Sequence, residues 1–440
     1  MPIINNRQSN IKRIRKQFSL HKFPNLKITI EGFLISLILL GIPLNLYKNR
    51  FYDDSWTVGE WLISYAGGFI RRGLPGQIIF YLSTHLNTNP IFFTWLISLF
   101  SIVFLFILIK IFCWDNFQKS FLLSSLVLLG PISEDYLVRK DVFLVLIYGT
   151  CLLTIRQLYL KKMSIFLSIL LINIFSVIAL LSHEAYGIWA IPSLFLLVFF
   201  YVKKNVTKTA RAIFLSFVFI FPSVYSFICC IIFKGNKSIA IAIHDSWKEF
   251  KDIMPSTELL YSVYPDGAIA WIGENLNSTF QLSISSLSKF NLFIFWHPLM
   301  WALTIFFAIR LFSGLKQDPY FNLKKIFILI QLIPFIPLFI IAHDYGRWIF
   351  IWSSSSCLLF SLIITIFKKE SIHLEAKAKR FKILDKLFPI IKNQRNYNIV
   401  ILLLGLPHCC WSLGRYLISN PIGFSIKNFI FYTSLVLNKL

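Results

Sequence analysis

Long apolar runs recur from about residue 28 to the C-terminal end of the chain, and they restrict its fold more than any other feature. Of the 440 residues, 56% are apolar and 46 are Phe. A helix needs roughly 20 apolar residues to cross a bilayer, so the runs predict an all-α fold, a polytopic transmembrane helical bundle of about 10–12 spans. Only 15% of the residues are charged, against roughly 25% in soluble domains, which excludes a soluble enzyme or a disordered chain.

Lysine and arginine gather in alternate segments between the apolar runs, which predicts an orientation. Residues 1–27 carry seven basic residues and no acid. The positive-inside rule therefore predicts that they form a basic cytoplasmic tail. The remainder, 28–440, is expected to be the membrane domain, with outer loops at 48–75 and 234–289 and a basic cytoplasmic loop at 368–397. The expected location is the cell membrane, inner or plasma, as a multi-pass protein.

The apolar runs differ in length, and the full-length ones are the predicted spans. These lie near 28–47, 90–112, 142–159, 164–182, 186–202, 212–233, 290–312, 325–342, 348–367 and 398–416. A run at 77–86 is short enough to lie at the membrane interface. Another, 120–132, is too short to cross a full bilayer alone and is expected to be a tilted or shortened span. Whether the last run, 428–438, spans the membrane stays open.

The formal net charge of +24 does not predict a nucleic-acid partner. A nucleic-acid-binding protein collects its basic residues on one face of a folded domain, whereas here they form short groups between apolar runs. The sequence also has no phosphate-binding loop motif, no dinucleotide fingerprint and no paired CxxC. The seven cysteines lie in or beside apolar runs. No cofactor is evident, although a divalent cation remains possible.

Ionisable residues collect at span ends on the predicted outer side. Such residues near membrane depth usually face a protein interior or a water-filled cavity. We therefore expect them to converge on one outward cavity, covered by the long loop at 234–289. The candidate site residues are Asp53, Asp54, Glu60, Arg71, Arg72, Arg139, Lys140, Asp141, His183, Glu184, His343, Asp344 and Arg347.

The acidic residues of the first outer loop are the candidate catalytic groups. Asp53 and Asp54 closely follow the first predicted span. A carboxylate there can take a proton from an acceptor hydroxyl or hold a divalent cation. The alternative is an acidic pair solvated at a helix start. Glu60 belongs either to the same site or to the cap of a short helix.

The segment YAGGFIRRGLPG, residues 65–76, places Arg71 and Arg72 between glycines that allow tight turns. The planar fork of arginine suits phosphate oxygens. Two arginines on the outer side also oppose the positive-inside trend, which favours a role in binding phosphate or pyrophosphate. The alternative is that they pair with Asp53 or Asp54 or contact lipid headgroups.

A second charged segment, SEDYLVRKD, begins at residue 133. Arg139 and Lys140 can complete an anion site there, oriented by Asp141; the alternative is a loop that neutralises itself. His183 and Glu184 join two spans with almost no loop, so we expect them to be partly buried.

Burial predicts a charged partner for Glu184, because a buried unpaired carboxyl has a raised pKa. Arg71 or Arg139 would be a suitable partner, and an interfacial hairpin cap is the alternative. In HDYGRW, beginning at His343, Asp344 and Arg347 are three apart and can pair on one helix turn.

The predicted architecture resembles that of glycosyltransferases of the GT-C type in three features. These are the many spans, an acidic outer loop directly after the first span, and a site on the outer face. In that family an Asp or Glu of this loop is a base or metal ligand, and positive residues hold a lipid-phosphate donor. The resemblance thus implies Asp53 or Asp54 as the base, with Arg71, Arg72 and Arg139 on the phosphate. The string GGFIRRGL is also similar to one in membrane proteins of bacterial surface-polysaccharide clusters.

The expected function is that of a membrane glycosyltransferase in cell-surface polysaccharide assembly. Its donor would be a lipid-linked sugar phosphate at the extracytoplasmic face, and membrane lipid would be its other partner. Two alternatives stay open. One is a polymerase of polysaccharide repeat units, and the other is a transporter or flippase of an anionic glycolipid.

Overall fold

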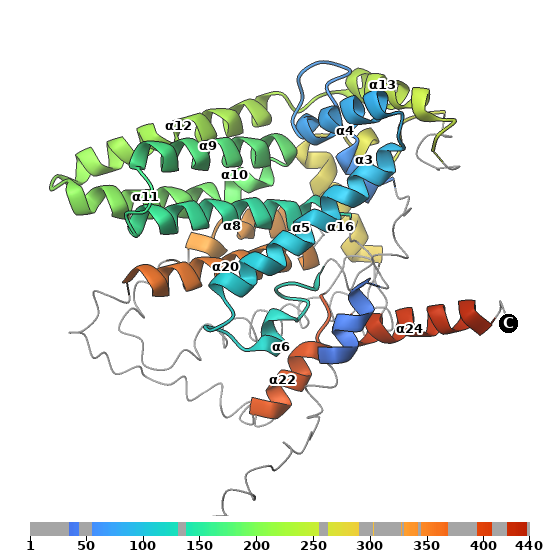
Figure 1. The fold of residues 1–440 in the computed structure, drawn as a ribbon. Helices are drawn as coiled ribbons and strands as arrows, with labels where there is room; N and C mark the ends of the chain where they lie inside the picture. Colours follow the sequence, from blue (N-terminus) through green and yellow to red (C-terminus); the bar gives the residue numbers. More distant parts are fainter. Residues whose placement is uncertain are drawn as a thin grey trace, which may run out of the picture.

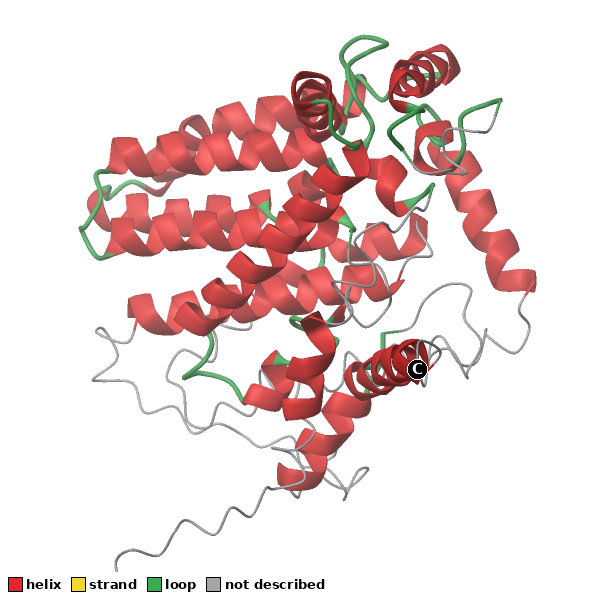
Figure 2. Cartoon of the chain, turned by 45° about the vertical axis from the view of Figure 1, so that its right-hand side comes forward, coloured by secondary structure: helices red, strands yellow, loops and turns green. Residues whose placement is uncertain are grey.

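The computed structural model describes residues 35–43, 55–130, 138–254, 263–289, 302, 327, 330–341, 345–367, 394–406 and 420–437. Every regular element among them is a helix, as Figure 2 shows, and this part of the chain has no strand. Within these described ranges, six helical stretches are long and apolar enough to cross a membrane. They are α5 (Pro90–Phe112), α8 (Lys140–Tyr159), α9 (Ile165–Ser182), α10 with α11 (Ala185–Trp189 and Ile191–Asn205), α12 (Thr209–Ile232) and α20 (Tyr345–Phe367).

The long helices form one bundle, which confirms the predicted helical membrane fold. In Figure 1, α8, α9, α11 and α12 lie side by side and α5 crosses them obliquely. Helix α8 is central, because it packs against α5, α9, α11 and α20. In its most apolar stretch α20 is 83% buried inside the protein, whereas α12 is only 22% buried. Thus α20 belongs to the interior, and α12 presents apolar side chains to lipid.

Helix boundaries follow local signals that the sequence carries. The side chain of Asn89 accepts a hydrogen bond from the N–H of Ile91 at the start of α5, with Pro90 as the first helical residue. Ser164 caps α9 in the same way, accepting from the N–H of Leu167. These signals depend on neighbouring residues only, and the predicted spans between 90 and 233 agree with the helices within a few residues.

The segment expected to be a short span at 120–132 is different. Only α6 (Lys119–Leu122) is helical, and the chain then continues as turns to Gly130 with its side chains buried. The hydroxyl of Ser354 in α20 donates to the carbonyl oxygen of Val127 at 2.6 Å. Irregular backbone at membrane depth requires such cover by protein, because lipid offers no hydrogen-bond partners.

The two ends of the bundle differ in charge. At one end lie α3 (Thr57–Trp61), α4 (Gly73–Leu86) and α13 (Lys237–Ser246). The other end, where α8 and α11 finish, is rich in basic residues: Lys110, Lys119, Arg156, Lys161, Lys162, Lys203, Lys204, Lys208 and Arg211. This distribution agrees with a basic cytoplasmic side.

The two predicted outer loops contain short helices that pack together. Residues 234–289 include η2 (Trp247–Phe250), α15 (Gly267–Ala270) and α16 (Leu276–Lys289). The indole N–H of Trp247 donates to the carbonyl of Leu62 at 2.7 Å. The N–H of Ala268 donates to the carbonyl of Ser55 at 3.0 Å. The second outer loop therefore lies against the first.

Further elements are α19 (Phe335–Ile341), α22 (Gln394–Leu403), α24 (Pro421–Leu437) and a helix over 35–43. The expected cytoplasmic tail, nearly all of the basic loop at 368–397 and most of the span at 290–312 lie outside the described residues. The total of 10–12 spans therefore stays a prediction.

Candidate functional site

Charged side chains from five parts of the chain meet at the end of the bundle that carries α3 and α4. All are buried or largely buried, with side chains no more than 25% exposed. We call this group the charged cluster. It consists of Glu60 in α3, Arg71 and Arg72 before α4, Lys140 and Asp141 at the start of α8, His183 and Glu184 between α9 and α10, and Arg347 at the start of α20.

Glu184 binds both arginines of the glycine-rich segment. Its oxygens accept from Nε and Nη2 of Arg72 at 2.7 and 2.5 Å, and Oε1 lies 3.1 Å from Nη1 of Arg71. The predicted partner Arg71 is therefore confirmed, and Arg72 is an additional one. Burial alone would raise the pKa of Glu184, but Arg72 and Arg71 hold it well below its usual range. The carboxylate stays ionised and fixes both guanidinium groups.

The backbone before α4 is shaped to present these arginines. Arg72 has a φ of 67°, in the left-handed region that residues other than Gly seldom adopt. Such strain is common at ligand-binding sites. Gly76 allows α4 to approach the preceding turn closely, because an added Cβ would lie 2.1 Å from the carbonyl oxygen of Ile63. The N–H of Arg71 also donates to the carbonyl of Phe233 at the end of α12.

Glu60 lies between three basic side chains. One oxygen is 3.3 Å from Nε2 of His183 and 3.9 Å from Nη1 of Arg72, and the other is 3.8 Å from Nη2 of Arg347. Burial would raise the pKa of Glu60, but Arg347, His183 and Lys140 hold it well below its usual range. A carboxylate with a low pKa is a weak base. The geometry therefore favours Glu60 as an organiser of the cluster.

His183 is held as a neutral imidazole. Its Nδ1 accepts from the N–H of Ala185 at 3.2 Å, which leaves the proton on Nε2, facing Glu60. Burial and Arg72 lower its pKa, against the opposing effects of Glu184 and Glu60. His183 therefore supports the carboxylate without adding a positive charge at neutral pH.

Asp141 joins α8 to α20. Its two oxygens accept from Nε and Nη2 of Arg347 at 2.7 and 2.9 Å, a bidentate pair between residues 206 apart in sequence. The expectation that Asp141 orients Arg139 and Lys140 stays a prediction; the structure adds that its oxygens bind an arginine of another helix. The pair that the sequence predicts between Arg347 and Asp344 stays a prediction, since Asp344 lies outside the described residues.

Lys140 is fully buried, and no carboxylate among the described residues lies within 4.0 Å of its ammonium group. The Nζ donates to the carbonyl of Ser182 at 3.1 Å and to that of Arg72 at 3.5 Å. It also lies 5.6 Å from the centre of the Trp61 ring. Glu60 and Glu184 attract the ammonium only from beyond 4.0 Å. A buried ammonium without a direct ion pair is costly, so a bound anion would stabilise it.

Among the described residues, the cluster has more basic side chains than carboxylates. Four basic side chains face three carboxylates. The basic side chains are those of Arg71, Arg72, Lys140 and Arg347, and the carboxylates are those of Glu60, Asp141 and Glu184. Arg139, the N-cap residue of α8, is also buried beside them at 9% exposure. Such an excess, close to the surface of a membrane protein, suits an anionic ligand.

Four predicted site residues, Asp53, Asp54, His343 and Asp344, lie outside the described residues. Their placement in the site stays a prediction. In the part of the chain that the structure describes, no group of three His, Cys, Asp or Glu side chains could hold a metal ion. A divalent cation at Asp53 and Asp54 thus remains untested. Trp61, whose ring lies beside Lys140, is not among the predicted site residues, because nothing in the charge pattern of the sequence marks it.

The fold and the cluster define a class, a multi-pass helical membrane protein with a buried group of charged residues at one end of its bundle. Comparisons with family models, with curated proteins and with solved structures found no match.

Proposed function

We propose that this protein is a membrane glycosyltransferase that acts in cell-surface polysaccharide assembly in the cell membrane. Its donor is a lipid-linked sugar phosphate, bound at the extracytoplasmic face. The observation that carries the proposal is the excess of basic groups among the described residues of the charged cluster, above all the buried Lys140 with no described carboxylate within 4.0 Å of its ammonium group. A phosphate supplies the missing counter-charge.

The orientation supports the outer face as the place of reaction. Basic residues crowd the opposite end of the bundle, which the positive-inside rule assigns to the cytoplasm. The sequence also has no motif for binding a nucleotide sugar. A donor that is already anchored in the membrane can be presented at the outer face and requires no nucleotide-binding motif.

In the proposed reaction an acceptor hydroxyl attacks the anomeric carbon of the donor sugar. The new bond joins the acceptor oxygen to that carbon, and the bond between the carbon and the phosphate oxygen breaks. Asp53 or Asp54 takes the acceptor's proton. Arg71 and Arg72 stabilise the negative charge that develops on the leaving lipid phosphate. Glu60 and Glu184 hold these guanidinium groups in place beforehand.

The test is sugar transfer by the full-length protein in nanodiscs, from synthetic lipid phosphosugars and with or without divalent cation. We expect Arg72→Gln to lower transfer about 100-fold, since a charge-assisted hydrogen bond contributes roughly 1.5–3 kcal/mol. Lys204→Gln, at the opposite end of the bundle, is the matched control and should retain activity. If Asp53→Asn and Asp54→Asn each keep full transfer at normal membrane levels, the assignment of the base is wrong.

One observation favours transport of an anionic glycolipid as a second candidate. Polar side chains form a buried chain inside the bundle: Nε2 of Gln331 donates to the hydroxyl of Tyr148 at 2.9 Å, and that hydroxyl lies 2.8 Å from the hydroxyl of Ser193. Transporters carry polar groups near the bilayer midplane. A flipping assay with a fluorescent lipid phosphate in proteoliposomes separates the candidates, because only a transporter moves the lipid between leaflets.

A further inference from the structure

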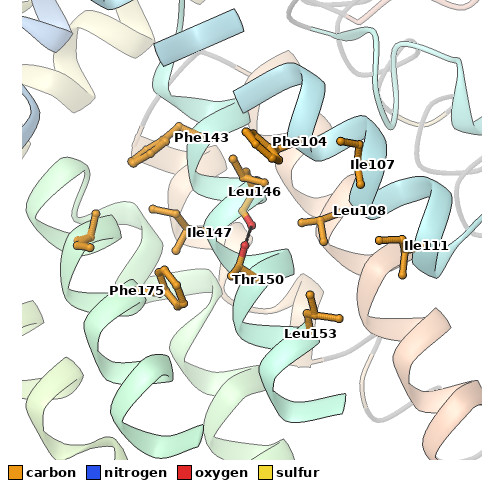
Figure 3. Close-up of a pocket in the computed structure, with 11 residues that line it drawn as sticks. Phe104, Ile107, Leu108, Ile111, Phe143, Leu146, Ile147, Thr150, Leu153 and Phe175 are labelled. Atoms are coloured by element: carbon orange, nitrogen blue, oxygen red, sulfur yellow. Dashed lines mark hydrogen bonds between the residues drawn. The ribbon is translucent and has the colours of Figure 1, made fainter. Parts of the chain in front are cut away.

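An apolar groove of about 480 Å³ lies between α5, α8 and α9. Figure 3 shows Phe104 of α5, Phe143 of α8 and Phe175 of α9 around it. Among the described residues that line it, Thr150 is the one polar residue, and its hydroxyl donates to the carbonyl of Leu146 within α8. The groove walls therefore offer hydrocarbon contacts and no unused hydrogen-bond donor.

The α5 wall of the groove faces the surrounding bilayer. The side chains of Phe104, Ile107 and Ile111 are 51%, 41% and 50% exposed. Because α5 is a candidate span, exposed apolar side chains at its middle contact lipid rather than water. A hydrocarbon chain can therefore enter the groove sideways from the membrane.

One end of the groove adjoins the charged cluster. Phe143 follows Lys140 by three residues in α8, so the two side chains lie on the same side of that helix. The Phe143 ring makes an edge contact with Trp61, with 5.8 Å between ring centres. The Trp61 ring in turn lies 5.6 Å from the ammonium of Lys140. Trp61 thus lies between the basic groups of the charged cluster and the apolar groove.

The groove runs along α8 from Phe143 to Leu153. At 1.5 Å per residue this is about 15 Å of helix, or roughly half the thickness of a bilayer's hydrocarbon core. Its long axis therefore runs from the membrane surface toward the middle of the bilayer. A lipid with its head at the cluster would place the first part of its chain in this space.

We infer that the groove between α5, α8 and α9 binds the hydrocarbon chain of a lipid phosphate whose head group lies at the charged cluster. The choice of a phosphate head rests on the proposed function. The choice of a lipid chain rests on the apolar lining, the exposure of α5 to lipid and the contact through Trp61. The basic excess of the cluster complements the charge of such a head group.

The first experiment maps where the chain binds. A long-chain alkyl phosphate with a diazirine in its chain is photo-crosslinked to the full-length protein in nanodiscs, and mass spectrometry locates the labelled residues. We expect labelling of groove residues on α5, α8 and α9 that excess unlabelled alkyl phosphate removes and alkyl alcohol of equal length does not. Equal labelling of the lipid-facing Phe217 on α12, or equal competition by the alcohol, would show bulk lipid only and overturn the inference.

The second experiment fills the groove. Thr150→Trp should weaken binding of the alkyl phosphate about tenfold or more, since 1.4 kcal/mol corresponds to tenfold in affinity. Thr150→Val, which keeps the groove open, and Phe217→Trp, on the exposed face of α12, are matched controls and should bind normally. Melting temperatures of all variants show whether they fold. If folded Thr150→Trp binds as well as the unchanged protein, the groove is not the chain site.

Failure of this inference is distinct from failure of the proposed function. Binding in the groove without sugar transfer from any donor retains the lipid site and rejects the transferase. Transfer that is insensitive to Thr150→Trp retains the transferase and rejects the groove.

Discussion

Asp141 and Arg347 lie 206 residues apart in the chain and form a bidentate ion pair in the structure, with N–O distances of 2.7 and 2.9 Å. The pair ties the start of α8, the central helix, to the start of α20, the most buried one. Both helices begin at the charged cluster. The pair therefore links the geometry of the cluster to the packing of the bundle.

Breaking this pair should destabilise the whole protein. We expect Asp141→Asn to cost about 3 kcal/mol, because the buried Arg347 loses its bidentate carboxylate partner. The melting temperature of the purified protein in detergent measures the loss. Replacing both residues, with Asp141→Leu and Arg347→Met, should cost less than either single change. A double variant as unstable as the sum of the two would contradict a direct pair.

Lys140 should behave in the opposite way. Lys140→Met removes a fully buried ammonium but keeps the length of the side chain. Since no described carboxylate forms a direct ion pair with that buried charge, we expect the melting temperature to stay the same or rise, while affinity for an alkyl phosphate falls about 10- to 100-fold. Lys248→Met, at a half-exposed lysine of η2, is the control for both measurements. Unchanged binding by folded Lys140→Met would exclude Lys140 from the anion site.

Glu184 should contribute stability that depends on pH only in acid. The arginines beside it hold its pKa in the folded protein well below the usual range. Its contribution to stability is therefore complete above about pH 4.3, the ordinary value for Glu in an unfolded chain. Stability should therefore stay level from about pH 8 to 5 as far as this group is concerned, and fall as the carboxylate is protonated at lower pH. Glu184→Gln should have a lower melting temperature at neutral pH and a shallower decline in acid. Identical pH profiles would contradict the pairing.

His183 has a linkage of the same sign as Glu184, but at a higher pH. Its pKa in the folded protein is lowered by burial, so the unfolded chain binds a proton near pH 6.5 that the folded protein excludes. Stability should then fall as pH drops below about 6.5, until the folded pKa is reached. His183→Gln should remove this part of the pH dependence. The measurement is melting temperature between pH 8 and 5, and an unchanged slope in that variant would refute a neutral His183.

Gly76 should tolerate no side chain. An added Cβ would lie 2.1 Å from the carbonyl oxygen of Ile63, so α4 must shift away from the preceding turn. Gly76→Ala is expected to cost about 1–3 kcal/mol, as overpacking does, and to weaken alkyl phosphate binding by moving Arg72. Gly68→Ala tests the same segment differently: the Cβ has open space, and only the φ of 108° opposes it. A fully stable Gly76→Ala with normal binding would refute this close contact.

The sequence alone determined the class of fold and most helix boundaries between residues 90 and 233. Both depend on local properties: the length of an apolar run, a capping Asn89 or Ser164, and the basic residues that follow a helix. The same reasoning singled out all eight residues of the charged cluster, because ionisable side chains at span ends are costly unless they face one another.

Only the tertiary structure decided which of those residues touch. Arg347 binds Asp141 of another helix, and Glu184 binds two arginines at once. The turns of residues 123–130 and the apolar groove were likewise absent from the sequence prediction. Charge and hydropathy indicate that a residue needs a charged partner or burial by protein, but they do not identify that partner. That choice follows from how whole helices pack, and packing depends on side-chain shape across segments far apart in the chain.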